Sequence, residues 1–266
     1  MKNMIRSPFE TVQQSLASFA PIDLAQMNDV SLLDRVDTKY LLGLSELGAI
    51  LPLMTPHYRI LDIGGVRLNR YHTLYFDTND FTLYRQHHNG LASRYKVRAR
   101  KYLDTDVAFF EIKHKTNRSR TIKSRLPIPD LITQIGSPID QFIDARMPLD
   151  AWQLEPKLWN EYLRITLVGK HQPERITIDL NLKFGWGDAH SILSTLAIVE
   201  VKQSDFSQSS VFIQHMRRLG IRPASFSKYC VGVWSLYQDI KVNNFKSQIR
   251  MVKKLMEKEA VHASLQ

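Results

Sequence analysis

The clearest pattern in the chain is a regular alternation of cationic and apolar residues in one short segment. Between positions 93 and 102, cations stand at every second position: Arg94, Lys96, Arg98 and Arg100. Successive side chains of a β-strand point to opposite faces, so this spacing predicts a strand with a row of cations on one face. The residues between them, Tyr95, Val97 and Ala99, are apolar enough to pack against a core. Neighbouring cations repel one another unless an anion joins them, and the planar guanidinium group suits phosphate.

The same division into an apolar face and a charged face recurs along the chain. It is found in residues 31–42, 109–115, 162–167, 175–180 and 196–202. Some charged faces carry a carboxylate beside a cation, as in Glu200 with Lys202 and Arg175 with Asp179. Closing such a sheet with the charges inside would form a water-filled, cation-rich tunnel with a few carboxylates. The sequence therefore predicts an α+β protein built on a closed antiparallel β-barrel with flanking helices.

Periodicity and capping residues predict the remaining elements. Helices are expected over residues 9–19, 45–54, 205–218, 225–240 and 244–260. The candidate caps are Ser45, then Asp205 or Ser207, then Ser225 or Ser227. Strands over 58–62 and 66–78 flank the Gly64-Gly65 turn, and the basic strand is expected to form a hairpin with the strand that ends at Lys115.

The organisation of the chain favours one domain. The proline-rich stretch from Pro127 to Trp159 predicts an inserted helical segment rather than a second domain. We therefore expect a single domain over residues 1–266, with a core over about 21–240 and a basic C-terminal helix over 241–266.

Composition narrows the partners and the compartment. The chain has 36 Lys plus Arg against 26 Asp plus Glu, a net charge of +10, which favours polyanions such as polyphosphate, nucleotides, nucleic acid or anionic lipid. Cys230 is the single cysteine, which excludes an internal disulfide and a Cys-based metal site and favours a reducing compartment. No signal peptide or apolar membrane-spanning stretch is evident, so a cytoplasmic location is expected.

Eight short motifs occur in the order found in a known family. They are Asp34-Arg35-Val36-Asp37-Thr38-Lys39-Tyr40, Tyr75-Phe76-Asp77-Thr78, Lys96-Val97-Arg98-Ala99-Arg100, Glu111-Ile112-Lys113, Tyr162-Leu163-Arg164, Thr177-Ile178-Asp179, Glu200-Val201-Lys202 and Ser225-Phe226-Ser227-Lys228-Tyr229. In this respect the chain resembles the VTC domain, the catalytic domain of the vacuolar transporter chaperone polyphosphate polymerase. That family belongs to the triphosphate tunnel metalloenzymes, together with the CYTH-type triphosphatases. The resemblance extends from about Pro21 to Trp234.

The resemblance implies roles for particular residues. The catalytic phosphate-binding set would be Lys39, Arg98, Arg100, Lys113, Lys123, Arg164 and Lys228. Further substrate contacts are expected from Arg35, Lys96, Lys202 and Ser227. Glu200 matches the principal metal-ligand glutamate of the family, and Glu111 is a second candidate ligand, for Mn²⁺ or Mg²⁺.

The implied activity is metal-dependent transfer of the ATP γ-phosphate to a growing polyphosphate chain. Hydrolysis of inorganic or nucleoside triphosphate is the alternative reaction, and a non-catalytic polyphosphate-binding module is a third possibility. CYTH-type enzymes usually begin with a Glu-x-Glu-x-Lys strand, whereas this chain has Asp37-x-Lys39, which favours the VTC branch. Expected partners are ATP, inorganic triphosphate or polyphosphate and a membrane protein. Nucleic acid is not expected, since no recognition helix or stacking motif stands out.

Purely structural roles compete with these assignments. Glu200 could pair with Lys202 or a neighbouring arginine, and Asp179 could orient a cation. Arg35 and Asp37 could form a structural pair, and the cations of the C-terminal helix could simply be solvated.

Overall fold

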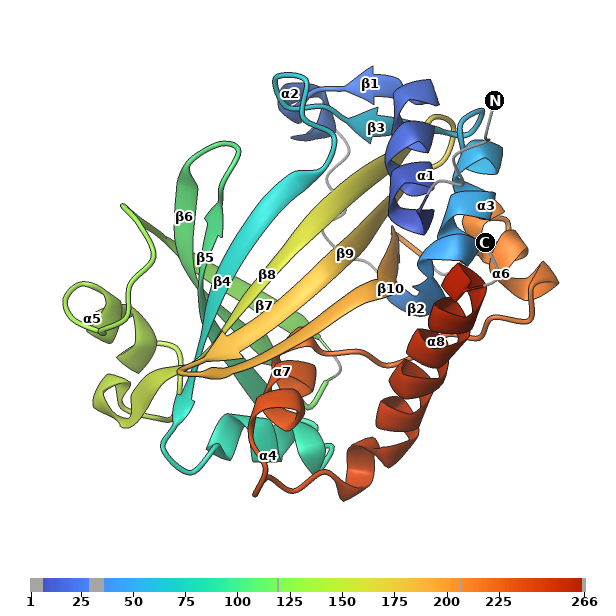
Figure 1. Ribbon diagram of the computed structural model, residues 1–266. Helices are drawn as coiled ribbons and strands as arrows, with labels where there is room; N and C mark the ends of the chain where they lie inside the picture. The colour runs from blue at the N-terminus through green and yellow to red at the C-terminus, as the bar shows by residue number, and fades with distance from the viewer. Residues whose placement is uncertain (1–6, 29–35, 119, 206, 265–266) are drawn as a thin grey trace.

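A computed structural model describes residues 7–28, 36–118, 120–205 and 207–264 (Figure 1). Its main feature is a ten-stranded sheet in which eight strands follow the order β2-β10-β9-β8-β4-β5-β6-β7. All ladders along this path are antiparallel. The short strand β3 joins one end of β8, and β1 pairs with β3 in parallel. The strands are β1 Ala20–Ile22, β2 Val36–Gly43, β3 Tyr58–Leu61, β4 Asn69–Thr78, β5 Arg94–Tyr102, β6 Val107–Lys115, β7 Thr121–Ile128, β8 Leu154–Gly169, β9 Glu174–Trp186 and β10 Ala189–Gln203.

Helices cover the sheet and close one of its ends (Figure 1). The α-helices are α1 Pro8–Ser15, α2 Leu24–Asn28, α3 Leu44–Met54, α4 Thr82–His88, α5 Ile139–Asp144, α6 Val211–Arg218, α7 Lys228–Leu236 and α8 Lys246–Ser264. Three 3-10 turns, Leu16–Ser18, Ala151–Gln153 and Asn243–Phe245, connect them to neighbouring segments. Within the described residues, no helix is both long enough and apolar enough to cross a membrane.

Two apolar cores lie on the outer face of the sheet. The first joins β2, β8, β9 and β10 to α1, α3 and α6, through residues such as Leu42, Leu167 and Phe212. The second joins β4, β5 and β6 to the segment around α5, through residues such as Phe76 and Phe110. A third core lies on the inner face, where Tyr75, Phe184 and other residues pack against α4, α7 and α8. The alternation predicted from the sequence therefore places apolar residues outward along the charged strands and leaves the charged row facing inward.

A bulge in β9 exchanges the two faces of that strand. Ile178 and Leu180 belong to an outer core, but Leu182 and Phe184 belong to the inner one, although all four have even numbers. The exchange coincides with Asn181, whose φ of 51° is left-handed, and with a register shift against β8. As a consequence, Asp179 points inward whereas Lys183 and Gly185 lie on the outer face.

The sheet curls without closing, so the predicted closed barrel is not confirmed. Within the described residues no ladder joins the terminal strands β2 and β7. The free edge of β2 bonds instead to the segment before α7, where the Ala224 amide donates to the Lys39 carbonyl at 2.8 Å. The curl still brings β2 near β5 and β6: burial lowers the pKa of Lys96 and Lys113, and the nearby charge of Lys39 lowers both further.

The basic hairpin and the C-terminal helix form as predicted, but several other boundaries differ. β8 begins at Leu154, inside the stretch expected to be helical, and α5 is its one α-helix. The Gly64-Gly65 turn forms, with Ile63 and Val66 bridged across it, but β3 and β4 do not pair with each other, since they follow one another along the same edge of β8. A sequence pattern does not specify which strands pair when both faces of a segment are buried.

Two helix starts also differ from the predictions. Gly43 rather than Ser45 is the N-cap of α3, and the missing side-chain cap is replaced by Glu259 of α8, which accepts a bond from the Ser45 amide at 3.0 Å. The helix before Gly220 begins later than expected, with Ser210 as its cap. Ser227 caps α7 as expected.

Candidate functional site

The inner face of the sheet gathers the charged residues that the sequence singles out. We use the term cationic interior for nine cations on this face: Lys39, Lys96, Arg98, Arg100, Lys113, Lys123, Arg164, Lys202 and Lys228. They come from β2, β5, β6, β7, β8, β10 and the first position of α7. Three carboxylates, Glu111, Asp179 and Glu200, lie among them, and the charge of a fourth, Asp37 of β2, also acts on Lys113 and Lys202. The interior is therefore strongly positive, and each carboxylate organises a different part of it.

Glu111 forms a buried ion-pair cluster between β5, β6 and β7. Arg98 donates to its Oε2 from Nε at 2.7 Å, with Nη2 2.6 Å from the same oxygen, and Lys123 contacts Oε1. The Glu111 side chain is 1% exposed. Burial raises the pKa of Glu111, but attraction to Arg98, Arg100 and Lys123 outweighs burial and holds this pKa well below its usual range. Glu111 is therefore ionised and its charge is already neutralised.

Asp179 has a similar position between β9, β8 and α7. Arg164, its cross-strand neighbour, donates two bonds to it, at 2.6 Å to Oδ1 and 2.8 Å to Oδ2. Lys228 contacts Oδ2 from the first residue of α7. Burial raises the pKa of Asp179, yet the two cations hold this pKa well below normal. Asp179 thus fixes two of the predicted phosphate-binding cations, the orienting role that the sequence left open.

Glu200 is paired less completely. Its Oε2 accepts a bond from Lys202 at 2.7 Å, but its Oε1 is 3.8 Å from the Lys39 ammonium group. The Glu200 side chain is 20% exposed, compared with 4% for Asp179. Lys39 directs its hydrogen bond to the Phe226 carbonyl at 3.0 Å, and Lys202 also donates to Thr177 at 2.9 Å. One oxygen of Glu200 therefore faces the interior without a close cation among the described residues.

Two stacked tyrosines line the cations between the Glu111 and Asp179 clusters. The rings of Tyr71 and Tyr162 are 5.0 Å apart and nearly parallel. The guanidinium groups of Arg100 and Arg164 lie over both rings, at 4.9 to 5.9 Å from the ring centroids. The Tyr162 hydroxyl is buried and has no hydrogen-bond partner among the described residues. Aromatic faces hold the guanidinium groups without neutralising them, so their charge stays available to a ligand.

Several lysines of the cationic interior have a lowered pKa. Burial, with repulsion from Lys39, Lys113 and Arg98, lowers the pKa of Lys96 to about 7. Burial is also the main cause that lowers the pKa of Lys113, Lys123 and Lys228 to about 8. The nine cations outnumber the four carboxylates near them, and a bound anion would relieve the remaining repulsion.

The structure brings together all the predicted phosphate-binding and substrate-binding residues that it describes. Arg35 lies outside the described residues. Ser227 uses its hydroxyl to accept a bond from the Cys230 amide at 3.3 Å as the cap of α7, next to Lys228. The sequence assigned no role to Tyr71, Thr73, Tyr162 and Thr177, which contact the cations. The sequence could have indicated Tyr162 and Thr177, because each shares a strand face with a charged residue two positions away.

The sequence profile of the VTC domain matches residues 34–237. The chain belongs to the VTC domain family. The cationic interior lies within the part of the chain that matches the VTC domain. No curated protein matches the chain.

Solved structures share the fold at low sequence identity. A candidate adenylyl cyclase from Hippeastrum, described as having a dominant triphosphatase activity, superposes with a TM-score of 0.50 at 13% identity, over 77% of this chain and 98% of that one. A candidate adenylate cyclase from Bacillus halodurans gives a TM-score of 0.48 at 13% identity, over 73% of this chain and 94% of its own. At such identities the likeness concerns the fold.

Proposed function

We propose that this VTC domain transfers the γ-phosphate of ATP to a growing polyphosphate chain bound in the cationic interior. The observation that carries the proposal is the excess of cations over carboxylates on one curved sheet face, nine against four in the described residues when Asp37 is included. A linear phosphate polymer presents a negative charge at each repeat, so it can contact several of these cations at once. Membership of the VTC domain family supports the polymer as substrate.

The interior also suits one divalent cation. No group of three or more His, Cys, Asp or Glu side chains that could hold a metal occurs among the described residues. Mg²⁺ is often bound by one or two carboxylates together with substrate phosphates, and a single glutamate meets that need. Glu200 fits, because its Oε1 faces the interior and its nearest cation is 3.8 Å away. Glu111 fits less well, because Arg98 and Lys123 already occupy both of its oxygens.

The residues of the chain act by fixing positive charge where phosphate charge develops. In phosphoryl transfer the charge spreads over the oxygens of the transferring group, so catalysis rests on position and electrostatics. Glu111 and Asp179 hold Arg98, Arg164 and Lys228 in place before substrate binds, which avoids reorganisation during the reaction. Glu200 would hold the metal ion, which would supply further positive charge to the phosphate groups. The buried Tyr162 hydroxyl has no partner among the described residues, and in this proposal it would donate a hydrogen bond to a phosphate oxygen.

The test is product analysis with purified protein, ATP and Mn²⁺, resolved on a polyphosphate gel. The expected result is a ladder of long chains that is lost in Arg98→Ala and Glu200→Gln. A matched control is Glu257→Gln on the exposed side of α8, which should leave the ladder unchanged.

Other outcomes would redirect the assignment. If the protein released free phosphate from ATP or tripolyphosphate and formed no ladder, it would be a triphosphatase and not a polymerase. Binding of polyphosphate without either product would reduce the site to a binding module and overturn the proposed reaction.

A further inference from the structure

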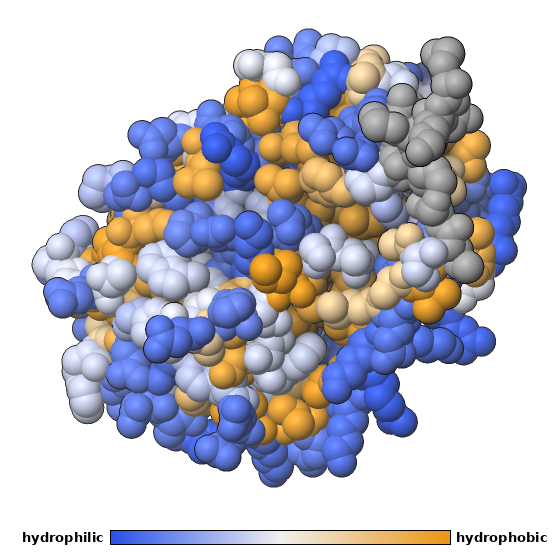
Figure 2. Space-filling view, viewed as in Figure 1, coloured by the Kyte–Doolittle hydropathy of each residue, from blue (hydrophilic) through white to orange (hydrophobic). Residues whose placement is uncertain are grey.

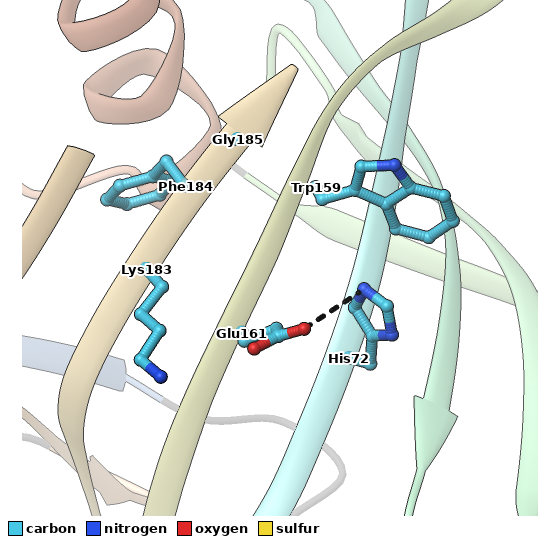
Figure 3. Close-up of a pocket in the computed structure, with 6 residues that line it drawn as sticks. All are labelled: His72, Trp159, Glu161, Lys183, Phe184 and Gly185. Carbon is cyan, nitrogen blue, oxygen red and sulfur yellow. Dashed lines mark ion pairs between the residues drawn. The ribbon is translucent and has the colours of Figure 1, made fainter. Parts of the chain in front are cut away.

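A second pocket lies on the opposite, outer face of the sheet (Figure 3). It has a volume of about 320 Å³ and is lined by His72 of β4, Trp159 and Glu161 of β8, and Lys183, Phe184 and Gly185 of β9. On β8, the neighbouring Tyr162 and Arg164 point to the cationic interior, so Glu161 and Trp159 face away from it. The sheet therefore separates this outer pocket from the interior.

The outer pocket occupies the gap between the two outer cores. Leu163 packs against the core under α1 and α3, whereas Trp159 packs against the core around α5. In Figure 1 the middle of β4, β8 and β9 faces the viewer with no helix across it. Figure 2 shows polar residues over this part of the same face. A ligand could reach these residues without crossing either core.

Gly185 provides the floor of the outer pocket. It is paired in register with Trp159 and carries no side chain, while the Trp159 indole leans away from it over β4 and packs on the His72 ring, with ring centroids 4.6 Å apart (Figure 3). A Cβ at this position would meet no described atom closer than the Ala189 carbonyl oxygen, at 3.7 Å. The floor is thus flat backbone bounded by an aromatic wall, a shape that accepts a planar ring.

A donor and an acceptor stand side by side on the wall of the outer pocket. His72 and Glu161 are cross-strand neighbours, and Nε2 of His72 is 3.7 Å from Oε1 of Glu161, too far for a hydrogen bond. Burial lowers the pKa of His72 more than Glu161 raises it, so the imidazole is neutral at pH 7. A neutral imidazole can donate from one ring nitrogen while the carboxylate accepts. Such a pair matches the edge of an aminopurine, where a ring nitrogen accepts and the adjacent amino group donates.

Lys183 adds a positive charge at the opposite rim. It is paired in register with Glu161 and exposed, and in Figure 3 its side chain extends away from Trp159. We propose that the outer pocket binds an adenine nucleotide, with the base on Gly185 against Trp159, its amino edge on Glu161 and His72, and its phosphate toward Lys183. This site goes beyond the proposed reaction, since it lies on the face of the sheet opposite the cationic interior.

The test is calorimetric titration of the full chain with AMP in the presence of saturating inorganic tripolyphosphate, which occupies the interior cations. AMP is expected to bind under these conditions. Gly185→Val, which fills the floor, should weaken AMP at least about tenfold, or about 1.4 kcal/mol. Lys183→Ala should weaken it less, and ribose 5-phosphate, which lacks the base, should not bind. The charge-matched control Lys253→Ala on α8 should leave AMP affinity unchanged.

Three outcomes would overturn the proposal: no AMP binding by the wild-type chain, displacement of AMP by tripolyphosphate, or unchanged affinity in Gly185→Val. If Gly185→Val does not fold, Glu161→Ala changes an exposed side chain of the same pocket and should also weaken AMP binding. Loss of polymer synthesis in the interior variants, with AMP binding retained, would separate this site from the proposed reaction.

Discussion

The Glu111 cluster and the Glu200 cluster contain the same residue types but differ in how completely they are paired. Glu111 is buried, with Arg98 and Lys123 on its two oxygens. Glu200 is one-fifth exposed and has one close cation, Lys202, on one oxygen. Both carboxylates are ionised, because their pKa is lowered by neighbouring cations. A carboxylate in the interior can therefore either hold cations in place or keep an oxygen available for a metal ion. The number of cations that contact its two oxygens distinguishes the two roles.

The largest expected effect comes from breaking a completed cluster. Asp179→Ala leaves Arg164 and Lys228 buried without a counter-charge, and removing one partner from a buried ion pair costs about 3–5 kcal/mol. Urea unfolding should show this loss of free energy of unfolding. An effect below about 1 kcal/mol would mean that the Asp179 cluster does not hold the fold together.

The second prediction compares the two glutamates directly. Glu111→Gln should destabilise the protein by about 2 kcal/mol or more, since a neutral amide leaves a buried cation unpaired. Glu200→Gln should change the free energy of unfolding by less than about 1 kcal/mol, because Lys202 keeps its bond to Thr177. Chemical denaturation of the two variants, with turnover measured in parallel, gives the comparison. Equal destabilisation by both changes would contradict the distinction between the clusters.

The third prediction concerns pH. Lys96, Lys113, Lys123 and Lys228 have a folded-state pKa near 7 to 8, below the usual lysine value. Above pH 7 the unfolded chain therefore binds more protons than the folded one, so these groups make the ligand-free protein more stable as pH rises from about 7 to 9. Thermal denaturation at several pH values measures this trend.

The same lysines link anion binding to protons. A bound polyphosphate favours their charged form, so binding should take up protons and weaken as pH rises from about 7 to 9. Calorimetry in buffers of different ionisation enthalpy measures the uptake. Absence of proton uptake on binding would show that the lysines are already fully charged in the free protein.

The smallest effect is expected at the junction of α8 with α3. Glu259 is buried and caps the amide of Ser45, and Gly43 leaves room for it, since a Cβ there would lie 2.0 Å from the Glu259 Oε1. Glu259→Gln should cost about 1 kcal/mol through loss of charge at a helix N-terminus. Denaturant midpoints report this loss, and Glu257→Gln on the same helix is the exposed control. A stabilised variant would contradict the capping role.

The sequence predicted the charged face of each main strand because alternation with a period of two is a local property. It also predicted the capped start of α7 and the basic C-terminal helix, since caps and periodicity depend on a few neighbouring residues. The resemblance to the VTC domain family then indicated the cations that the structure gathers in one interior. Those residues needed no knowledge of strand order, because all but Lys228 lie on strand faces that the local pattern identifies, and Lys228 follows the cap of a helix.

The tertiary structure decided which charges meet and whether the sheet closes. The pairing of Asp179 with both Arg164 and Lys228 depends on strand order and on where α7 begins. The bulge at Asn181 exchanges the faces of β9 and thereby opens the outer pocket at Gly185, and alternation alone cannot indicate such an exchange. The edge of β2 bonds to the segment at Ala224 rather than to β7, a contact between residues far apart in the chain. Local propensity does not predict such contacts, because they depend on how the whole sheet curls.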